Sequence, residues 1–181
     1  MVVSLFAGPP ASELAQVKLN SIRTERGVLV IEEDTKNIGA QRLVPVHSQL
    51  SALGFEKYVA DLRKRKQTHL FPVWYREGMA AKAKAPKETA TIDHYFPRFL
   101  SHRSNVTYLP KVGIVDSCKT WHSFRHTFKS GLKMAGVPKD MRDQLAGHSD
   151  SSAGAGYEHG QPVEAMKAAI EKLTFDGFAL G

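Results

Sequence analysis

Apolar residues recur along this chain at two different periods. Helical spacing, with apolar positions three or four apart, marks residues 12–19, 50–62, 123–135, 138–145 and 162–173. Two β-rich runs, 28–31 and 43–46, flank a polar stretch with Lys36, Asn37 and Gly39, which predicts a hairpin with a long loop. This order of elements predicts a mainly α domain with a small antiparallel sheet at one edge.

Local signals refine these elements. Ser48 is a plausible N-cap for the helix over residues 50–62. Residues 76–91 are polar, rich in Ala and Lys and broken by Pro86, which predicts a surface loop whose lysines either contact phosphate or remain solvated. Residues 91–102 have a helical pattern that Pro97 should bend. The apolar residues 1–8 are expected to be the end of a buried helix, so that the chain starts inside a folded unit.

Composition narrows the class of protein. The chain has 181 residues, enough for one hydrophobic core, and a net charge of +7. Twelve Lys and Arg stand against four Asp and Glu between positions 57 and 111, and such a concentrated excess favours a nucleic-acid partner. The single cysteine, Cys118, excludes an internal disulfide framework, and no apolar run is long enough to cross a bilayer. We therefore expect a cytoplasmic, DNA-associated protein.

The residues that could carry chemistry gather in the C-terminal third. His122 and Arg125 are three apart and should share a helix face. His122 and His126 have the spacing of a metal-binding pair, but no third ligand is apparent, so we expect no metal. His148 follows a predicted helix, and Tyr157 lies in a stretch rich in Gly, Ala and Ser. This tyrosine either reaches into a cleft or is merely exposed.

These residue types suit attack on a phosphodiester. A tyrosine hydroxyl, with a reference pKa of about 10, is a weak nucleophile that needs cations around the phosphate. Arg125 offers a planar fork for two phosphate oxygens, and His122 and His148 can donate hydrogen bonds or move protons. Lys36 could protonate the leaving oxygen. Neither a metal nor a cofactor is needed.

Four blocks appear in a familiar order. They are "GPPASELAQV" (pattern G-x-R-x-x-E-L), "TKNIGAQRLVPVH" (K-T-x-x-S-x-R-x-V-P-L-H), "HSFRHTF" (H-x-x-R-H-T-F) and "LAGHSDSSAGAGY" (L-G-H, then Y nine residues later). In these blocks the chain resembles the catalytic domain of the tyrosine recombinases, or phage-type integrases. The resemblance runs from about residue 5 to 157. It implies the breaking-rejoining fold of that family over residues 1–174, without the N-terminal domain that clasps DNA.

The resemblance also implies a mechanism. Tyr157 would be the nucleophile, forming a 3′-phosphotyrosyl link and freeing a 5′-hydroxyl that later attacks back. Arg125, His122 and His148 would stabilise the phosphate, and Lys36 would be the general acid. Double-stranded DNA would be the partner, contacted by Lys36, Arg42, Lys82, Lys84, Lys87 and Arg125. The tail over residues 175–181 would either dock on a second copy of the chain or be disordered.

One position departs from the family pattern. Pro10 stands where the family has the first of its two phosphate-gripping arginines. Arg23 and Arg26, beyond the first predicted helix, could reach back towards that place. We expect site-specific DNA recombination or integration with impaired cleavage. The alternatives are a non-catalytic DNA-binding remnant of a decayed mobile-element integrase, a type IB topoisomerase, and a helical protein–protein module.

Overall fold

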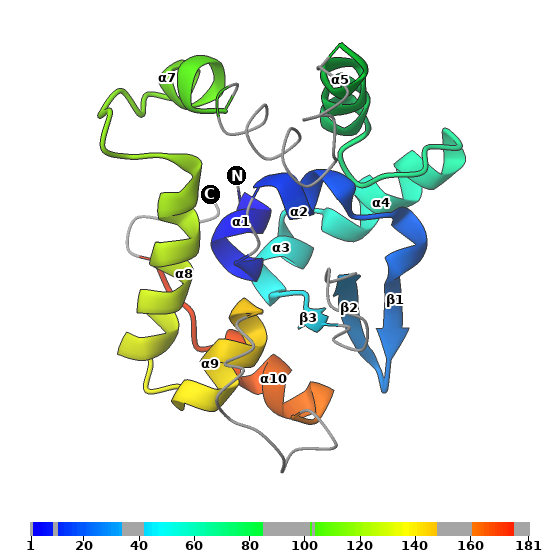
Figure 1. Ribbon diagram of the computed structural model, residues 1–181. Coiled ribbons are helices and arrows are strands. Elements are labelled where there is room, and N and C mark those ends of the chain that lie inside the picture. Colours follow the sequence, from blue (N-terminus) through cyan, green and yellow to red (C-terminus); the bar gives the residue numbers. More distant parts are fainter. Residues whose placement is uncertain are drawn as a thin grey trace.

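Helices dominate the chain, and a small sheet lies to one side of them (Figure 1). The structure is a computed structural model that describes residues 2–8, 11–33, 42–84, 102, 104–147 and 161–175. The α-helices of this part are α1 (Val2–Ala7), α2 (Ala11–Gln16), α3 (Ser48–Ala52), α4 (Phe55–Lys64), α5 (Pro72–Ala83), α7 (Leu109–Lys111), α8 (Trp121–Met134), α9 (Lys139–Ala146) and α10 (Val163–Ile170). The strands are β1 (Ile22–Glu25), β2 (Val28–Glu33) and β3 (Arg42–Pro45), with a 3₁₀ turn η1 (Leu19–Ser21) and a π-helical turn η2 (Ser104–Tyr108).

The three strands form an antiparallel sheet in the order β1-β2-β3. Ile31 is the central partner, opposite Ile22 on β1 and Val44 on β3. Val30 and Ile31 are both fully buried, although neighbouring strand residues point to opposite faces. The sheet is therefore covered on both faces.

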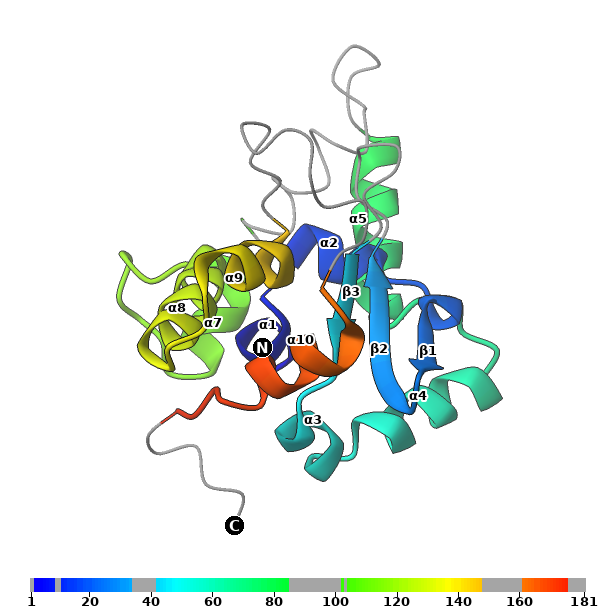
Figure 2. The ribbon, with the colours of Figure 1, turned by 90° about the horizontal axis from the view of Figure 1, so that it is seen from below.

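The main core joins this sheet to the helices. In Figure 2, α1 and α10 lie between α8 and the sheet, and α10 contacts both β2 and β3. Buried apolar side chains from each of these elements meet there: Phe6, Ile31, Val44, Phe128, Leu145 and Ile170. The sequence elements far apart in the chain are thus fixed to one another by a common apolar interior.

A second cluster, which we call the aromatic cluster, consists of Trp74, Tyr108, Trp121 and Phe124. Trp121 is its buried member, and its ring centroid lies 5.0 Å from that of Trp74 and 5.4 Å from that of Phe124. Both contacts are edge-to-face, the geometry that aromatic quadrupoles favour. The aromatic cluster joins α5 to the first turn of α8.

The expected fold class is confirmed: the described chain is mostly helical with a small antiparallel sheet. The helices expected near 123–135, 138–145 and 162–173 are present as α8, α9 and α10, and the two hairpin runs pair as β2 and β3. Pro138 and Pro162 are N-caps rather than first helical residues. The pattern over residues 91–102 lies almost wholly outside the described residues.

Other expectations were wrong in detail. The helix over residues 50–62 is split into α3 and α4 at Gly54, which has a φ of +84°, and its N-cap is His47 rather than Ser48. The loop expected from residue 76 is helical through residue 83 as the second half of α5. Strand β1 was not foreseen, and the first predicted helix ends at Gln16 rather than near residue 19.

Two further residues have structural roles. Arg63, in the basic end of α4, donates from Nη2 to the carbonyl oxygens of Leu19 (2.8 Å) and Ile22 (2.7 Å), which ties α4 to the start of β1. Phe175, assigned from the sequence to the C-terminal tail, packs edge-on against Phe6 of the same chain, with ring centroids 5.2 Å apart. The fold therefore extends through residue 175, while Phe178 and Leu180 lie outside the described residues.

Candidate active site

Helix α8 carries two of the predicted site residues, His122 and Arg125. Its start is fixed by the Thr120 backbone N–H, which donates to Ser123 Oγ at 3.1 Å, and by Trp121 in the aromatic cluster. One turn further, Phe128 is fully buried in the main core. Because both apolar anchors are held, the orientation of α8 is set, and Arg125 is turned towards the ends of α1 and α9.

Arg125 bridges two segments that are far apart in sequence. Its Nη1 donates to the carbonyl oxygen of Gly8 at 3.1 Å, and its Nη2 donates to that of Ala146 at 2.5 Å. Gly8 directly follows α1, and Ala146 is the last residue of α9. The last carbonyls of a helix lack intrahelical partners and carry partial negative charge, so a guanidinium is stabilised between two such ends.

Glycines end both helices in the left-handed conformation. Gly8 has a φ of +78° and Gly147 a φ of +69°, which non-glycine residues rarely adopt. Gly8 also lies directly against Phe128: a Cβ placed on it would stand 2.5 Å from Phe128 Cδ1. Gly8 is therefore required both by its backbone angle and by the close approach of α8.

His122 is the second predicted residue that the structure describes. It lies in the first turn of α8, and its ring centroid is 4.8 Å from that of His126 in an edge-to-face contact. Partial burial lowers the pKa of His122, and the charges of His126 and Arg125 lower it further. The neutral imidazole is therefore favoured at neutral pH, which suits a hydrogen-bond donor or a proton carrier more than a fixed cation.

Several predicted site residues lie outside the described residues: Pro10, Lys36, Lys87, His148 and Tyr157. The structure does describe the residues on either side of these undescribed segments. Gly8 precedes Pro9 and Pro10, Ala146 is two positions before His148, and Gln161 follows the segment of Tyr157. Arg125 thus joins the two segments that lead to Pro10 and to His148.

The return of the chain after Tyr157 is also fixed on α9. The backbone N–H of Gln161 donates to Gln144 Oε1 at 3.0 Å, and Gln161 Nε2 donates to Asp140 Oδ2 at 3.2 Å. The chain is therefore described up to Gly147 at the end of α9 and again from Gln161 at the side of the same helix. Sequence reasoning missed these three residues, because no pattern in the chain marks a glutamine as the partner of a helix 17 positions away.

The DNA-contact predictions fall on two regions. Arg42 begins β3 opposite Glu33, the last residue of β2, so it stands at the end of the sheet where the predicted hairpin loop begins. Lys82 lies in the last turn of α5, and Lys84 directly follows that helix as its C-cap. Lys84 is exposed and Lys82 half-buried. The structure does not test the role of these three residues, and their contact with DNA stays a prediction.

Arg23 and Arg26 both have carboxylate partners in the structure. Arg23 forms ion pairs with Glu25 (2.6 Å) and Glu32 (3.1 Å) on the sheet, and the hydrogen bond to Glu32 raises its pKa. Arg26 lies 3.8 Å from Glu164 of α10. In the described structure, then, both arginines have carboxylate partners on or near the sheet.

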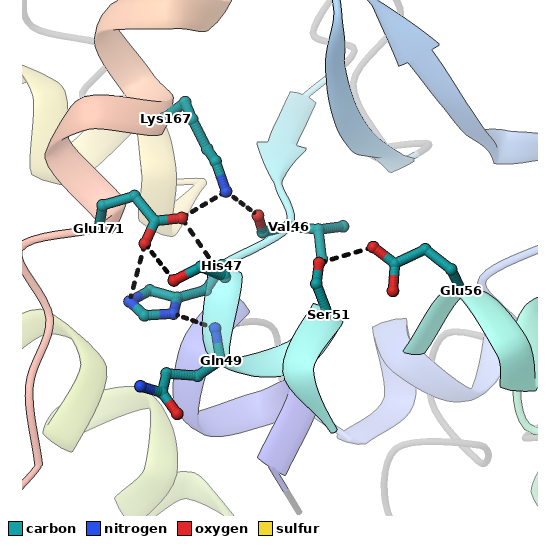
Figure 3. A network of polar contacts seen from close by, with 8 residues as sticks. Val46, His47, Gln49, Ser51, Glu56, Lys167 and Glu171 are labelled. Carbon is teal, nitrogen blue, oxygen red and sulfur yellow. Dashed lines mark hydrogen bonds and ion pairs between the residues drawn. The ribbon is translucent and has the colours of Figure 1, made fainter. Parts of the chain in front are cut away.

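His47, the last residue of the second sequence block, belongs to a network of polar contacts that joins α3 to α10 (Figure 3). His47 Nδ1 accepts the Gln49 backbone N–H at 3.0 Å and caps α3, while Glu171 accepts from the backbone N–H and hydroxyl of Ser48. Lys167 donates to the Val46 carbonyl at 2.5 Å and also pairs with Glu171. This network fastens the C-terminal end of α10 to the junction of β3 and α3.

Two kinds of site are not seen in the described ranges. No group of three or more His, Cys, Asp or Glu side chains in residues 2–8, 11–33, 42–84, 102, 104–147 and 161–175 could hold a metal ion. Within the same residues, no helix has both the length and the apolar character that a bilayer crossing requires.

Comparison with known families gives one result. The model of the phage integrase family matches residues 7–163, which is most of the chain and includes Arg125 and both segments that it bridges. Neither a comparison with curated proteins nor one with solved structures gave a match. The family match confirms the resemblance seen in the four sequence blocks. The chain belongs to the phage integrase family, the family of the tyrosine recombinases.

Proposed function

We propose that this chain is a site-specific recombinase domain that cleaves and rejoins double-stranded DNA through Tyr157. The phenolic oxygen attacks the phosphorus, the bond from phosphorus to the 5′-oxygen breaks, and a 3′-phosphotyrosyl link remains. Lys36 gives its proton to the leaving 5′-oxygen, and the phenolic proton passes to a basic group such as a histidine. Attack by a 5′-hydroxyl then reverses these steps and joins the strands.

The position of Arg125 is the observation that carries this proposal. Its guanidinium is held between Gly8 and Ala146 by hydrogen bonds within the chain. A preorganised cation does not have to be ordered when negative charge develops on the phosphate oxygens, and this is what makes such groups effective. Chain connectivity keeps the Cα atoms of Pro10 and His148 within about 7 Å of those of Gly8 and Ala146, respectively. The proposed phosphate site is therefore centred on Arg125.

The remaining residues take roles around that centre. His122 and His148 donate hydrogen bonds to the phosphate or carry protons, and the lowered pKa of His122 supports the neutral form that can do both. Lys36, Arg42, Lys82, Lys84 and Lys87 contact the DNA backbone, where neutralised phosphates release counterions. The catalytic domain, expected over residues 1–174 and packed through Phe175, takes the breaking-rejoining fold of the family and needs neither metal nor cofactor.

Pro10 should impair cleavage strongly. Removing one preorganised donor to a developing oxyanion slows catalysis by about 10²–10³-fold, and Pro10 replaces a charged one. Arg23 and Arg26, the other arginines that could have supplied the missing charge, are paired with carboxylates. The proline at position 10 also favours the second candidate function, a non-catalytic DNA-binding remnant of a mobile-element integrase.

Trapping on a nicked suicide DNA substrate tests the proposal. We expect the parent chain to give little covalent adduct, Pro10→Arg to raise the adduct rate by about 10²-fold, and Pro10→Arg with Tyr157→Phe to give none. Binding of the same DNA is measured in parallel at several salt concentrations. A Pro10→Arg chain that binds the DNA and yields no adduct would refute cleavage and leave the DNA-binding remnant. Absence of DNA binding even at low salt would refute both functions.

A further inference from the structure

Three side chains hold the place where the chain returns to α9, and we call them the Gln161 tether: Asp140, Gln144 and Gln161. Asp140 and Gln144 are four positions apart on α9 and therefore lie on one face of that helix. Gln144 accepts the backbone N–H of Gln161 at 3.0 Å, and Asp140 accepts its side-chain amide at 3.2 Å. Both the backbone and the side chain of Gln161 are thus bound along the same helix face.

The residues of the tether are few positions away in sequence from Ala146 and from Tyr157. Gln144 is two positions before Ala146, whose carbonyl binds Arg125. Tyr157 is four positions before Gln161, so covalent geometry keeps their Cα atoms within about 14 Å. If Gln161 were released, the next residue fixed by burial would be Val163, and the corresponding limit would rise to about 21 Å.

Other contacts hold α9 itself, so the tether is not needed to keep this helix in place. Leu145 and Ala146 are fully buried, and Lys129 of α8 lies 3.9 Å from Asp143. Gln161, in contrast, is half-buried and follows directly on the segment of Tyr157. Loss of the tether should therefore change the freedom of that segment rather than the fold.

We propose that Asp140 and Gln144 are positioning residues: by binding Gln161, they limit how far Tyr157 can lie from helix α9, whose last carbonyl binds Arg125. This inference rests on the proposed function, because it assigns the tether to the nucleophile. Holding a nucleophile near its target removes part of the entropy that would otherwise be lost during the reaction. The tether should accordingly affect the rate of adduct formation and leave the affinity for DNA unchanged.

The test compares three substitutions in the full chain with Pro10→Arg. Gln144→Leu removes the acceptor for the Gln161 N–H, and Gln144→Glu retains an acceptor oxygen. Gln67→Leu, at an exposed glutamine three residues after α4, is the matched control. We expect Gln144→Leu to slow adduct formation about five- to tenfold, as the loss of one hydrogen bond allows, without weakening DNA binding. Gln144→Glu should restore most of the rate, and Gln67→Leu should match the parent.

Hydrogen exchange provides a readout that does not need activity. Gln144→Leu should speed exchange in peptides that cover residues 148–161 and leave those of α8 unchanged. Unchanged exchange, or an adduct rate equal to that of the parent, would overturn the inference. If the Pro10→Arg parent itself forms no adduct, the proposed function fails and the nucleophile assignment fails with it, while the exchange data still decide whether the tether holds the segment.

Discussion

Gly8 should be among the least replaceable residues of this fold. An alanine there would adopt a φ of +78°, which costs a residue with a Cβ about 1–2 kcal/mol. Its Cβ would also stand 2.5 Å from Phe128 Cδ1, about 1 Å closer than carbon atoms pack comfortably. Phe128 is fully buried and cannot swing into solvent, so overpacking adds about 1–3 kcal/mol. Gly8→Ala should destabilise the protein by about 2–5 kcal/mol.

Gly54 supplies a matched control for this prediction. It has a φ of +84°, but no atom lies within 4 Å of the Cβ that an alanine would bring. Gly54→Ala should therefore show the backbone penalty alone, about 1–2 kcal/mol. Urea unfolding followed by the fluorescence of Trp74 and Trp121 measures both variants. If Gly8→Ala is no less stable than Gly54→Ala, the contact with Phe128 does not constrain Gly8, and the close approach of α8 is refuted.

Three further predictions concern Arg125, His47 and the lysines of α5. Arg125→Ala should lower the free energy of unfolding by about 1.5–3 kcal/mol because two helix-end carbonyls lose a charged donor, with Arg125→Lys intermediate; an unchanged urea midpoint would show that the bridge contributes nothing. Burial lowers the pKa of His47, so the unfolded state binds the extra proton first and stability should fall as the pH drops through about 6.5. His47→Asn keeps a capping side chain without titrating, and unfolding at pH 7.5 and 5.5 should show a smaller loss; an equal loss would exclude His47 as a source. Lys82→Ala with Lys84→Ala should reduce the slope of log affinity for DNA against log salt by up to about 2, and an unchanged slope would place α5 away from the DNA.

Much of the fold could be predicted from the sequence, because the long amphipathic helices and the two β-rich runs carry clear periods. The errors lie where local and tertiary preferences disagree. β1 has only Ile22 buried and otherwise polar residues, so it pairs through its backbone and leaves little apolar pattern. The second half of α5 is helical and not the expected loop, because its Ala, Met and Lys residues are strong helix formers and Pro86 lies beyond the end of the helix.

In the candidate site, too, local relations could be predicted from the sequence and contacts between distant segments could not. Motif spacing identified His122 and Arg125 and placed them on one face of a helix, because that relation is local. It could not show that the guanidinium binds the ends of α1 and α9, since this depends on how Phe128 packs Gly8 against α8. Nor could it assign a role to Gln144 or Gln161, which meet only in the folded chain.

The effect of Pro10 on catalysis and its effect on the stability of the fold can be measured separately. The described contacts that assemble the site are made by Gly8, Arg125 and Ala146 and by the core beneath them. Position 10 lies outside the described residues, and under the proposed mechanism a proline there removes a cation from the chemistry. Restoring arginine at this position should change adduct formation far more than it changes the free energy of unfolding, and that contrast separates an impaired recombinase from a domain that has lost its fold.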